Sequence, residues 1–141
     1  MTSEDAVRVW DKPIRLLWID GDHRYEPTWL DFTLWEPHLA EGGSLLMHDT
    51  IRKEPKRVLW EKIFCSGRFQ EIAIVDNITA VRKVKKASSA AIMRNYGTFV
   101  LRALYIAARK SSVPNSKTVG RNLLKQWTRQ TWLPLLLFMI S

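Results

Sequence analysis

The 141 residues are enough for one ordinary domain or for part of a larger one, and an apolar fraction of 46% with seven tryptophans excludes wholesale disorder. The single cysteine excludes an internal disulfide. The net charge of +8 is uneven: residues 1–50 hold four basic and ten acidic side chains, whereas residues 51–141 hold eighteen and four. This asymmetry predicts an acidic end that carries chemistry and a basic end that meets an anionic surface.

The N-terminal residues predict a short helix rather than a targeting segment. Thr2 or Ser3 can cap a helix that runs to about Trp10, before Pro13 breaks it. A signal peptide would need a basic region followed by an apolar one, and this segment instead carries acids. We therefore expect a cytoplasmic chain. Its basic end could also associate with a membrane surface.

A strand and a helix follow. Residues 14–19 are apolar except at Arg15, and a near-continuous apolar run is typical of a central parallel strand covered on both faces. Pro27 suits the first turn of a helix. We expect that helix to end near residues 38–39, because Gly42 and Gly43 supply a stop and a tight turn.

A second strand, "SLLM", ends in three polar residues: His48, Asp49 and Thr50. Strand, helix and strand of these lengths form a βαβ unit with parallel strands. The polar residues that follow the first strand, Asp20 to His23, therefore belong to the same edge of the sheet. In open α/β sheets this edge binds ligands.

The remaining segments complete an α/β fold. Residues 56–64 suit a helix, and residues 68–84 indicate two strands around an Asp76-Asn77 turn, which predicts a terminal antiparallel hairpin on a parallel sheet. Residues 90–110 are typical of a helix. A second helical stretch starts near Thr118 and is interrupted at Pro134.

The polar clusters offer metal-ligand chemistry. Carboxylates with an imidazole suit Mg²⁺, Mn²⁺ or Ca²⁺ in an open site better than a closed zinc site. The alternative is structural: Asp20 caps a loop, Asp22 caps the following helix and His23 lies at the surface. Two clusters on one edge favour the functional interpretation.

The segment "IDGDHRYEPTWLDFTLWEPHLAEGGSLLMHDT" resembles class I S-adenosylmethionine-dependent methyltransferases around their fourth and fifth strands. It is most similar to the subgroup with an "IDGDHxY…GG…HD" pattern, which is akin to cation-dependent O-methyltransferases. The resemblance covers about residues 10–84. It implies a partial Rossmann-like methyltransferase sheet, with residues 1–84 as the C-terminal half of the domain and residues 85–141 as a basic helical extension.

The resemblance also implies roles for individual residues. Asp20 becomes the first metal ligand, and His48 and Asp49 occupy the paired ligand positions and the catalytic positions after the fifth strand. Many relatives have Asp-Asn there, so His48 is a departure that either ligates the metal or acts as a general base. The side of the site that faces the cofactor or the acceptor is lined by Asp22, His23 and Tyr25.

The implied reaction is metal-assisted methyl transfer from S-adenosylmethionine to a hydroxyl of a small molecule or glycan, with Mg²⁺ as the expected cation. The fold's glycine-rich cofactor loop has no counterpart, because none of the six glycines forms a G-x-G. We therefore expect a truncated form with an unpaired sheet edge. The alternative is a noncatalytic half-domain that pairs with another chain, or with itself, at that edge.

From Lys85 onward the sequence has ten basic residues and no acid. Its basic residues and tryptophans, with the apolar "LPLLLFM", suit a peripheral contact with an anionic membrane. The alternative is two helices that pack on the domain and expose a basic face. Without a recognisable binding motif, we expect no specific nucleic acid partner. The uncharged run after Arg129 is about a dozen residues, fewer than the roughly 20 that span a bilayer.

Overall fold

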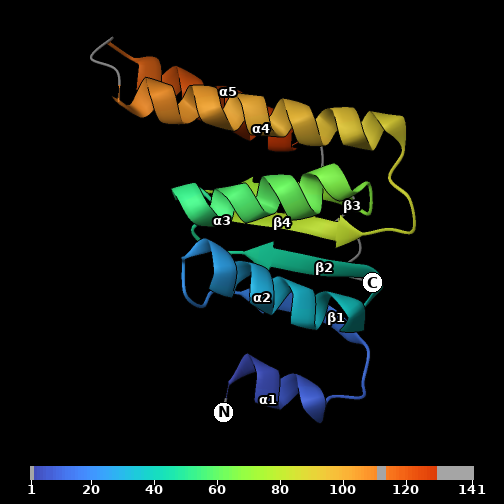
Figure 1. The fold of residues 1–141 in the computed structure, drawn as a ribbon. Coiled ribbons are helices and arrows are strands. Elements are labelled where there is room, and N and C mark those ends of the chain that lie inside the picture. Colours follow the sequence, from blue (N-terminus) through green and yellow to red (C-terminus); the bar gives the residue numbers. More distant parts are fainter. Residues whose placement is uncertain (1, 111–113, 130–141) are drawn as a thin grey trace.

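The computed structural model describes residues 2–110 and 114–129. Its helices and strands follow one another along a layered molecule, with α1 at one end and the α4–α5 pair at the other (Figure 1). The helices are α1 (Ser3–Arg8), α2 (Tyr25–Trp35), α3 (Lys53–Val58), α4 (Ser89–Lys110) and α5 (Ser116–Arg129). The strands are β1 (Ile14–Ile19), β2 (Leu39–Met47), β3 (Phe69–Val75) and β4 (Ile78–Lys83).

The described residues form one four-stranded sheet with the order β1-β2-β4-β3. Strands β1 and β2 are parallel and are joined through α2, as the βαβ prediction requires. Strands β3 and β4 form an antiparallel hairpin around Asp76, which has a φ of 51°, and β4 pairs antiparallel with β2. The predicted α/β class and the terminal hairpin are therefore confirmed, and the architecture is that of a partial Rossmann-like fold.

The predicted role of the paired glycines was wrong. They lie inside β2, where the register with β1 jumps from Leu39 to Ser44 and the intervening residues bulge out. Gly42 takes a φ of +77°, which favours glycine. At Gly43 a Cβ would come within 2.8 Å of the carbonyl oxygen of Ala40. The glycines thus shape a bulge in a strand. Helix α2 itself ends at Trp35, and a 3₁₀ turn continues it to His38, near the predicted end.

Strand β1 was predicted to be covered on both faces, and this prediction was wrong for one face. Leu17 and Ile19 are buried in the core, but Leu16 and Trp18, on the other face, are 61% and 48% exposed. Helices α2 and α3 lie over one face of the sheet (Figure 1). Strand β1 is an edge strand in the described sheet, so its outer edge is open.

The core lies between the sheet and the helices. After α3 the chain continues through a π-helical turn to a 3₁₀ turn that ends at Gly67, which has a φ of 67°. The predicted helix over residues 56–64 is therefore confirmed in position, although its second half is irregular. The fully buried side chains at the centre include Leu45, Val58, Leu59, Ile63, Phe64, Phe69 and Val81.

Helices α4 and α5 lie at the β3 end of the sheet, away from β1. The buried Asn95 donates from Nδ2 to the carbonyl oxygen of Phe69 in β3, at 2.9 Å. The buried Arg102 reaches Thr79 of β4 and Thr50 beyond β2. Both predicted helices exist up to Arg129; the predictions for Trp132, Pro134 and "LPLLLFM" lie outside the described residues. No helix among the described residues is long and apolar enough to cross a membrane.

Candidate functional site

The carboxyl ends of β1 and β2 bring the two predicted clusters together. Ile19 pairs with Met47 in the parallel ladder, and the backbone N–H of His48 donates to the carbonyl oxygen of Ile19 at 3.0 Å. This extends the ladder one residue beyond β2 and places two side chains side by side. His48 Nδ1 lies 2.7 Å from Asp20 Oδ1. The predicted meeting of the two clusters at one edge is confirmed.

The contact between His48 and Asp20 is short but poorly aligned as a hydrogen bond. Although the two atoms are 2.7 Å apart, the buried Nδ1 has no hydrogen-bond partner of acceptable geometry among the described residues. A nitrogen and a carboxylate oxygen that lie this close without a hydrogen bond between them are typical of two ligand atoms of one metal ion. Alternatively, Nδ1 can take up a proton beside the carboxylate.

Asp49 is held from several sides. Its backbone has a φ of +50°, a region that aspartate tolerates better than most residues. Its Oδ2 accepts from Arg52 Nε at 2.6 Å and lies 3.0 Å from His23 Nε2, while its Oδ1 accepts from Asn77 Nδ2 at 2.7 Å. The buried carboxylate is therefore fixed in position, and it orients the ring of His23.

Two residues of this site were missed in the sequence. Asn77, in the β3–β4 turn, contacts both Asp49 and His48, whose Nε2 lies 3.1 Å from the amide nitrogen. Trp18 stacks beside His48 with ring centroids 6.4 Å apart. Trp18 could have been found from its position, because a strand residue two places before Asp20 lies close to the same edge of the sheet. Nothing local signals Asn77, because only the sheet order brings the hairpin to this edge.

The three residues predicted to line the cofactor or acceptor side are separated by the structure. His23 lies in the cluster. Asp22 instead pairs with Arg24 at 2.6 Å, and hydrogen bonds from Arg24 lower the pKa of Asp22 to about 2. The hydroxyl of Tyr25 donates to Glu61 at 2.7 Å, and this bond to a carboxylate raises the pKa of Tyr25. Their binding roles stay predictions.

The donor atoms that converge best are those of Asp20, His23 and His48. One ligand atom from each lies within 4.8 Å of the others. The predicted metal set shares Asp20 and His48 with this group and has Asp49 where the group has His23. Because Asp49 contacts His23 directly, the two sets describe adjoining positions in one cluster. The chemistry of this donor set, one carboxylate and two imidazoles, fits a divalent cation with open coordination positions.

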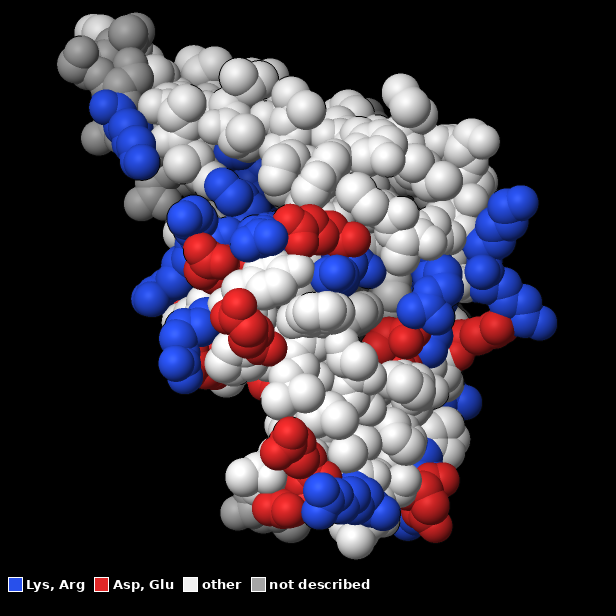
Figure 2. All heavy atoms as spheres, in the orientation of Figure 1, with Lys and Arg blue, Asp and Glu red and all other residues white. Residues whose placement is uncertain are grey.

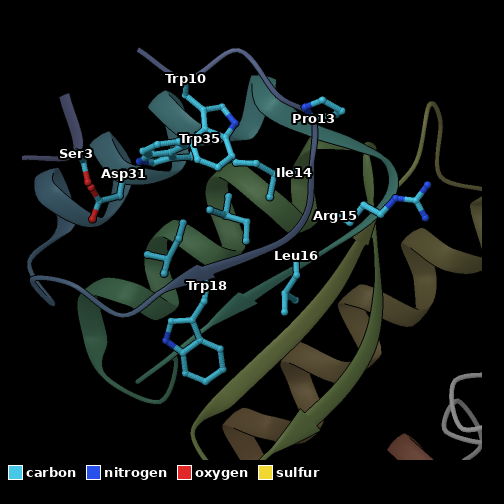
Figure 3. A pocket seen from close by; sticks show the side chains of 11 residues that line it. Ser3, Trp10, Pro13, Ile14, Arg15, Leu16, Trp18, Asp31 and Trp35 are labelled. Atoms are coloured by element: carbon cyan, nitrogen blue, oxygen red, sulfur yellow. The ribbon is translucent and has the colours of Figure 1, made fainter. Parts of the chain in front are cut away.

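A groove of about 520 Å³ follows the edge strand beside this cluster. Figure 3 shows Trp10 and Trp35 on one side of β1, and Leu16 and Trp18 on the other. The two tryptophans at the first side meet edge to face, with ring centroids 5.8 Å apart. The groove therefore combines an open strand edge with apolar side chains.

The fold and site define an α/β protein with polar side chains at the carboxyl ends of parallel strands. Residues 1–50 match the family model described as "Methyltransferase domain". The matched segment includes both strands that form the cluster, and ends at Thr50 directly after Asp49. This match supports a methyltransferase at the general level. Methyltransferase domains use S-adenosylmethionine in general, which agrees with the predicted cofactor.

Proposed function

We propose that this chain carries the metal and acceptor side of an S-adenosylmethionine-dependent O-methyltransferase. The observation that carries the proposal is the convergence of Asp20, His23 and His48 at the carboxyl edge of β1 and β2. The match of residues 1–50 to a methyltransferase domain supports the reaction class. The glycine-rich strand and loop expected for the methionine part of the cofactor would come from residues outside this sequence.

The cluster fits a divalent cation through its donor atoms and through the unpartnered Nδ1 of His48. Asp20, His23 and His48 would hold the ion, and Asp49 would orient His23 through the 3.0 Å contact with Nε2. A carboxylate behind a ligating histidine fixes its ring and its tautomer. When bound, the ion lowers the pKa of the acceptor hydroxyl and orients it.

The protein's own contribution is alignment and proton removal. In the reaction the bond between sulfur and the methyl carbon breaks, a carbon–oxygen bond forms, and the hydroxyl proton leaves. In the alternative in which His48 does not ligate the ion, its Nδ1 can receive that proton, because Asp20 at 2.7 Å stabilises the resulting imidazolium. The exposed ring of Trp18 beside His48 offers an apolar wall for the hydroxyl-bearing acceptor, a small molecule or a glycan. Holding the two reacting atoms in line supplies much of the rate.

Metal binding can be tested on this chain directly by titration with Mn²⁺, followed by electron paramagnetic resonance. We expect saturable binding that Asp20→Asn and His48→Gln each weaken by about tenfold or more, since each removes one of the few ligands. Asp22→Asn is the matched control, because that carboxylate pairs with Arg24 outside the group, and it should leave the affinity unchanged. Equal affinity in all variants would refute the metal assignment.

A second candidate is favoured by the open edge of β1. In this alternative the chain is a noncatalytic half-domain that adds a strand from another chain, or from a second copy, beside Leu16 and Trp18. Micromolar binding of S-adenosylmethionine by this chain would refute the half-domain and show that the truncation argument is wrong. Millimolar or no binding agrees with both candidates, and the Mn²⁺ titration then separates them. Leu16→Lys should abolish any association through the edge, as measured by light scattering.

A further inference from the structure

Helix α4 presents a stripe of apolar side chains to the outside. Met93, Val100 and Leu104 are 69%, 57% and 60% exposed, and Tyr96 lies between them. Their spacing of three and four residues places them on one face of the helix. We call these four residues the α4 stripe. Val119 and Leu123 of α5 are also exposed, four residues apart.

The rest of α4 is already used for packing, so the stripe is not part of the core. Asn95, Thr98 and Arg102 are fully or almost fully buried against the domain. Helix α5 packs against Gly97, where a Cβ would lie 2.8 Å from the ring of Trp127, and Trp127 Nε1 donates to Thr98 at 2.8 Å. The stripe is therefore the face of α4 that neither the sheet nor α5 occupies.

Basic side chains lie at the sides of this face. Figure 2 shows a broad uncharged surface over α4, with Lys and Arg side chains beside it rather than on it. The sequence from residue 85 to the end has ten basic residues and no acid, although Arg102 is buried. The exposed Lys86 precedes α4, and the exposed Lys110 is its last residue. A dimer through this face is disfavoured, because it would bring the basic side chains of two copies close together. A nucleic acid would need the cations on the face itself.

We propose that the α4 stripe docks on an anionic lipid surface, with α4 lying in the plane of the membrane. The exposed apolar side chains enter the boundary between headgroups and acyl chains, while the basic side chains around them meet anionic headgroups. This arrangement is peripheral. It does not depend on the methyl-transfer proposal, because the stripe belongs to α4 and the polar cluster to the carboxyl ends of β1 and β2.

Co-sedimentation with lipid vesicles tests the proposal on the full chain. Binding to vesicles of phosphatidylcholine with phosphatidylserine should exceed binding to phosphatidylcholine alone, and added salt should weaken it. The double variant Val100→Asp with Leu104→Asp should bind the vesicles at least about tenfold more weakly, since the two side chains no longer enter the apolar layer. Lys86→Ala should weaken binding about fivefold.

The matched control is Leu30→Asp, which places an acid on an exposed leucine of α2, away from α4. It should bind vesicles like the unmodified chain, and circular dichroism should show that all variants are folded. Equal sedimentation with both kinds of vesicle, or unchanged binding of the double variant, would overturn the proposal. So would a stable dimer in solution that the double variant dissociates, because the face would then be a protein interface.

Discussion

Arg102 is a buried cation whose replacement by an apolar side chain should leave the stability of the protein nearly unchanged. Its side chain is 2% exposed, and no carboxylate among the described residues lies within ion-pair distance of it. It donates from Nη1 to Thr79 Oγ1 at 2.5 Å and from Nη2 to Thr50 Oγ1 at 2.6 Å. Burial lowers the pKa of Arg102 from its usual value to about 10.

The expected effect follows from these contacts. The lowered pKa means that burial disfavours the charged form by about 3 kcal/mol. Arg102→Met removes this penalty and keeps most of the packing, but loses two hydrogen bonds from a charged group, worth about 1.5 kcal/mol each. The hydroxyls stay satisfied, because Thr50 and Thr79 contact each other at 2.8 Å and Thr50 also donates to Asn77 O. The two effects nearly cancel, so the free energy of unfolding should change by no more than about 1 kcal/mol.

Urea denaturation at neutral pH measures this difference. Lys110→Met, an exposed change on the same helix, should alter stability by no more than about 0.5 kcal/mol. Because the folded pKa is the lower one, the unfolded chain binds the extra proton above about pH 10, so the penalty on the unmodified chain should fade as the pH rises beyond that value. A loss of more than about 1 kcal/mol in Arg102→Met would refute the reasoning.

Three further outcomes are expected. The Asp22 carboxyl should titrate near pH 2 by carbon NMR and return toward 3.8 in Arg24→Ala; since its folded pKa is the lower one, the pair contributes stability above pH 3.8 that is lost as the pH falls toward 2. Gly43→Ala should cost about 1–3 kcal/mol in thermal unfolding, because its Cβ meets the Ala40 carbonyl; a neutral result would contradict the bulge geometry. Asn77→Ala should weaken Mn²⁺ binding by about tenfold, and unchanged affinity would show that the amide does not position the ligands.

The strands and their functional edge could be predicted because local pattern determines them. Apolar runs that end in Asp20 and in His48 identify two strands, and the single helix between them requires parallel pairing, which fixes a common edge. The Asp76-Asn77 turn could be predicted from residues that accept positive φ. These inferences need no knowledge of distant contacts.

The errors concern what lies next to an element in space. Apolar content at Leu16 and Trp18 indicates that the strand suits burial, but whether anything covers it depends on other segments. A glycine pair is compatible with a turn or with a strand bulge, and only the pairing of β2 with β1 distinguishes them. Asn77 reaches the site through the sheet order, which the residues around it do not encode.

The two ends of the sheet differ in a way that limits assembly. Helices α4 and α5 close the β3 end, so in the described part of the chain β1 provides the free edge. A copy that pairs through β1 uses its one open edge and leaves none for a third molecule. Edge-to-edge association should therefore stop at a two-fold symmetric pair and should not grow into a filament.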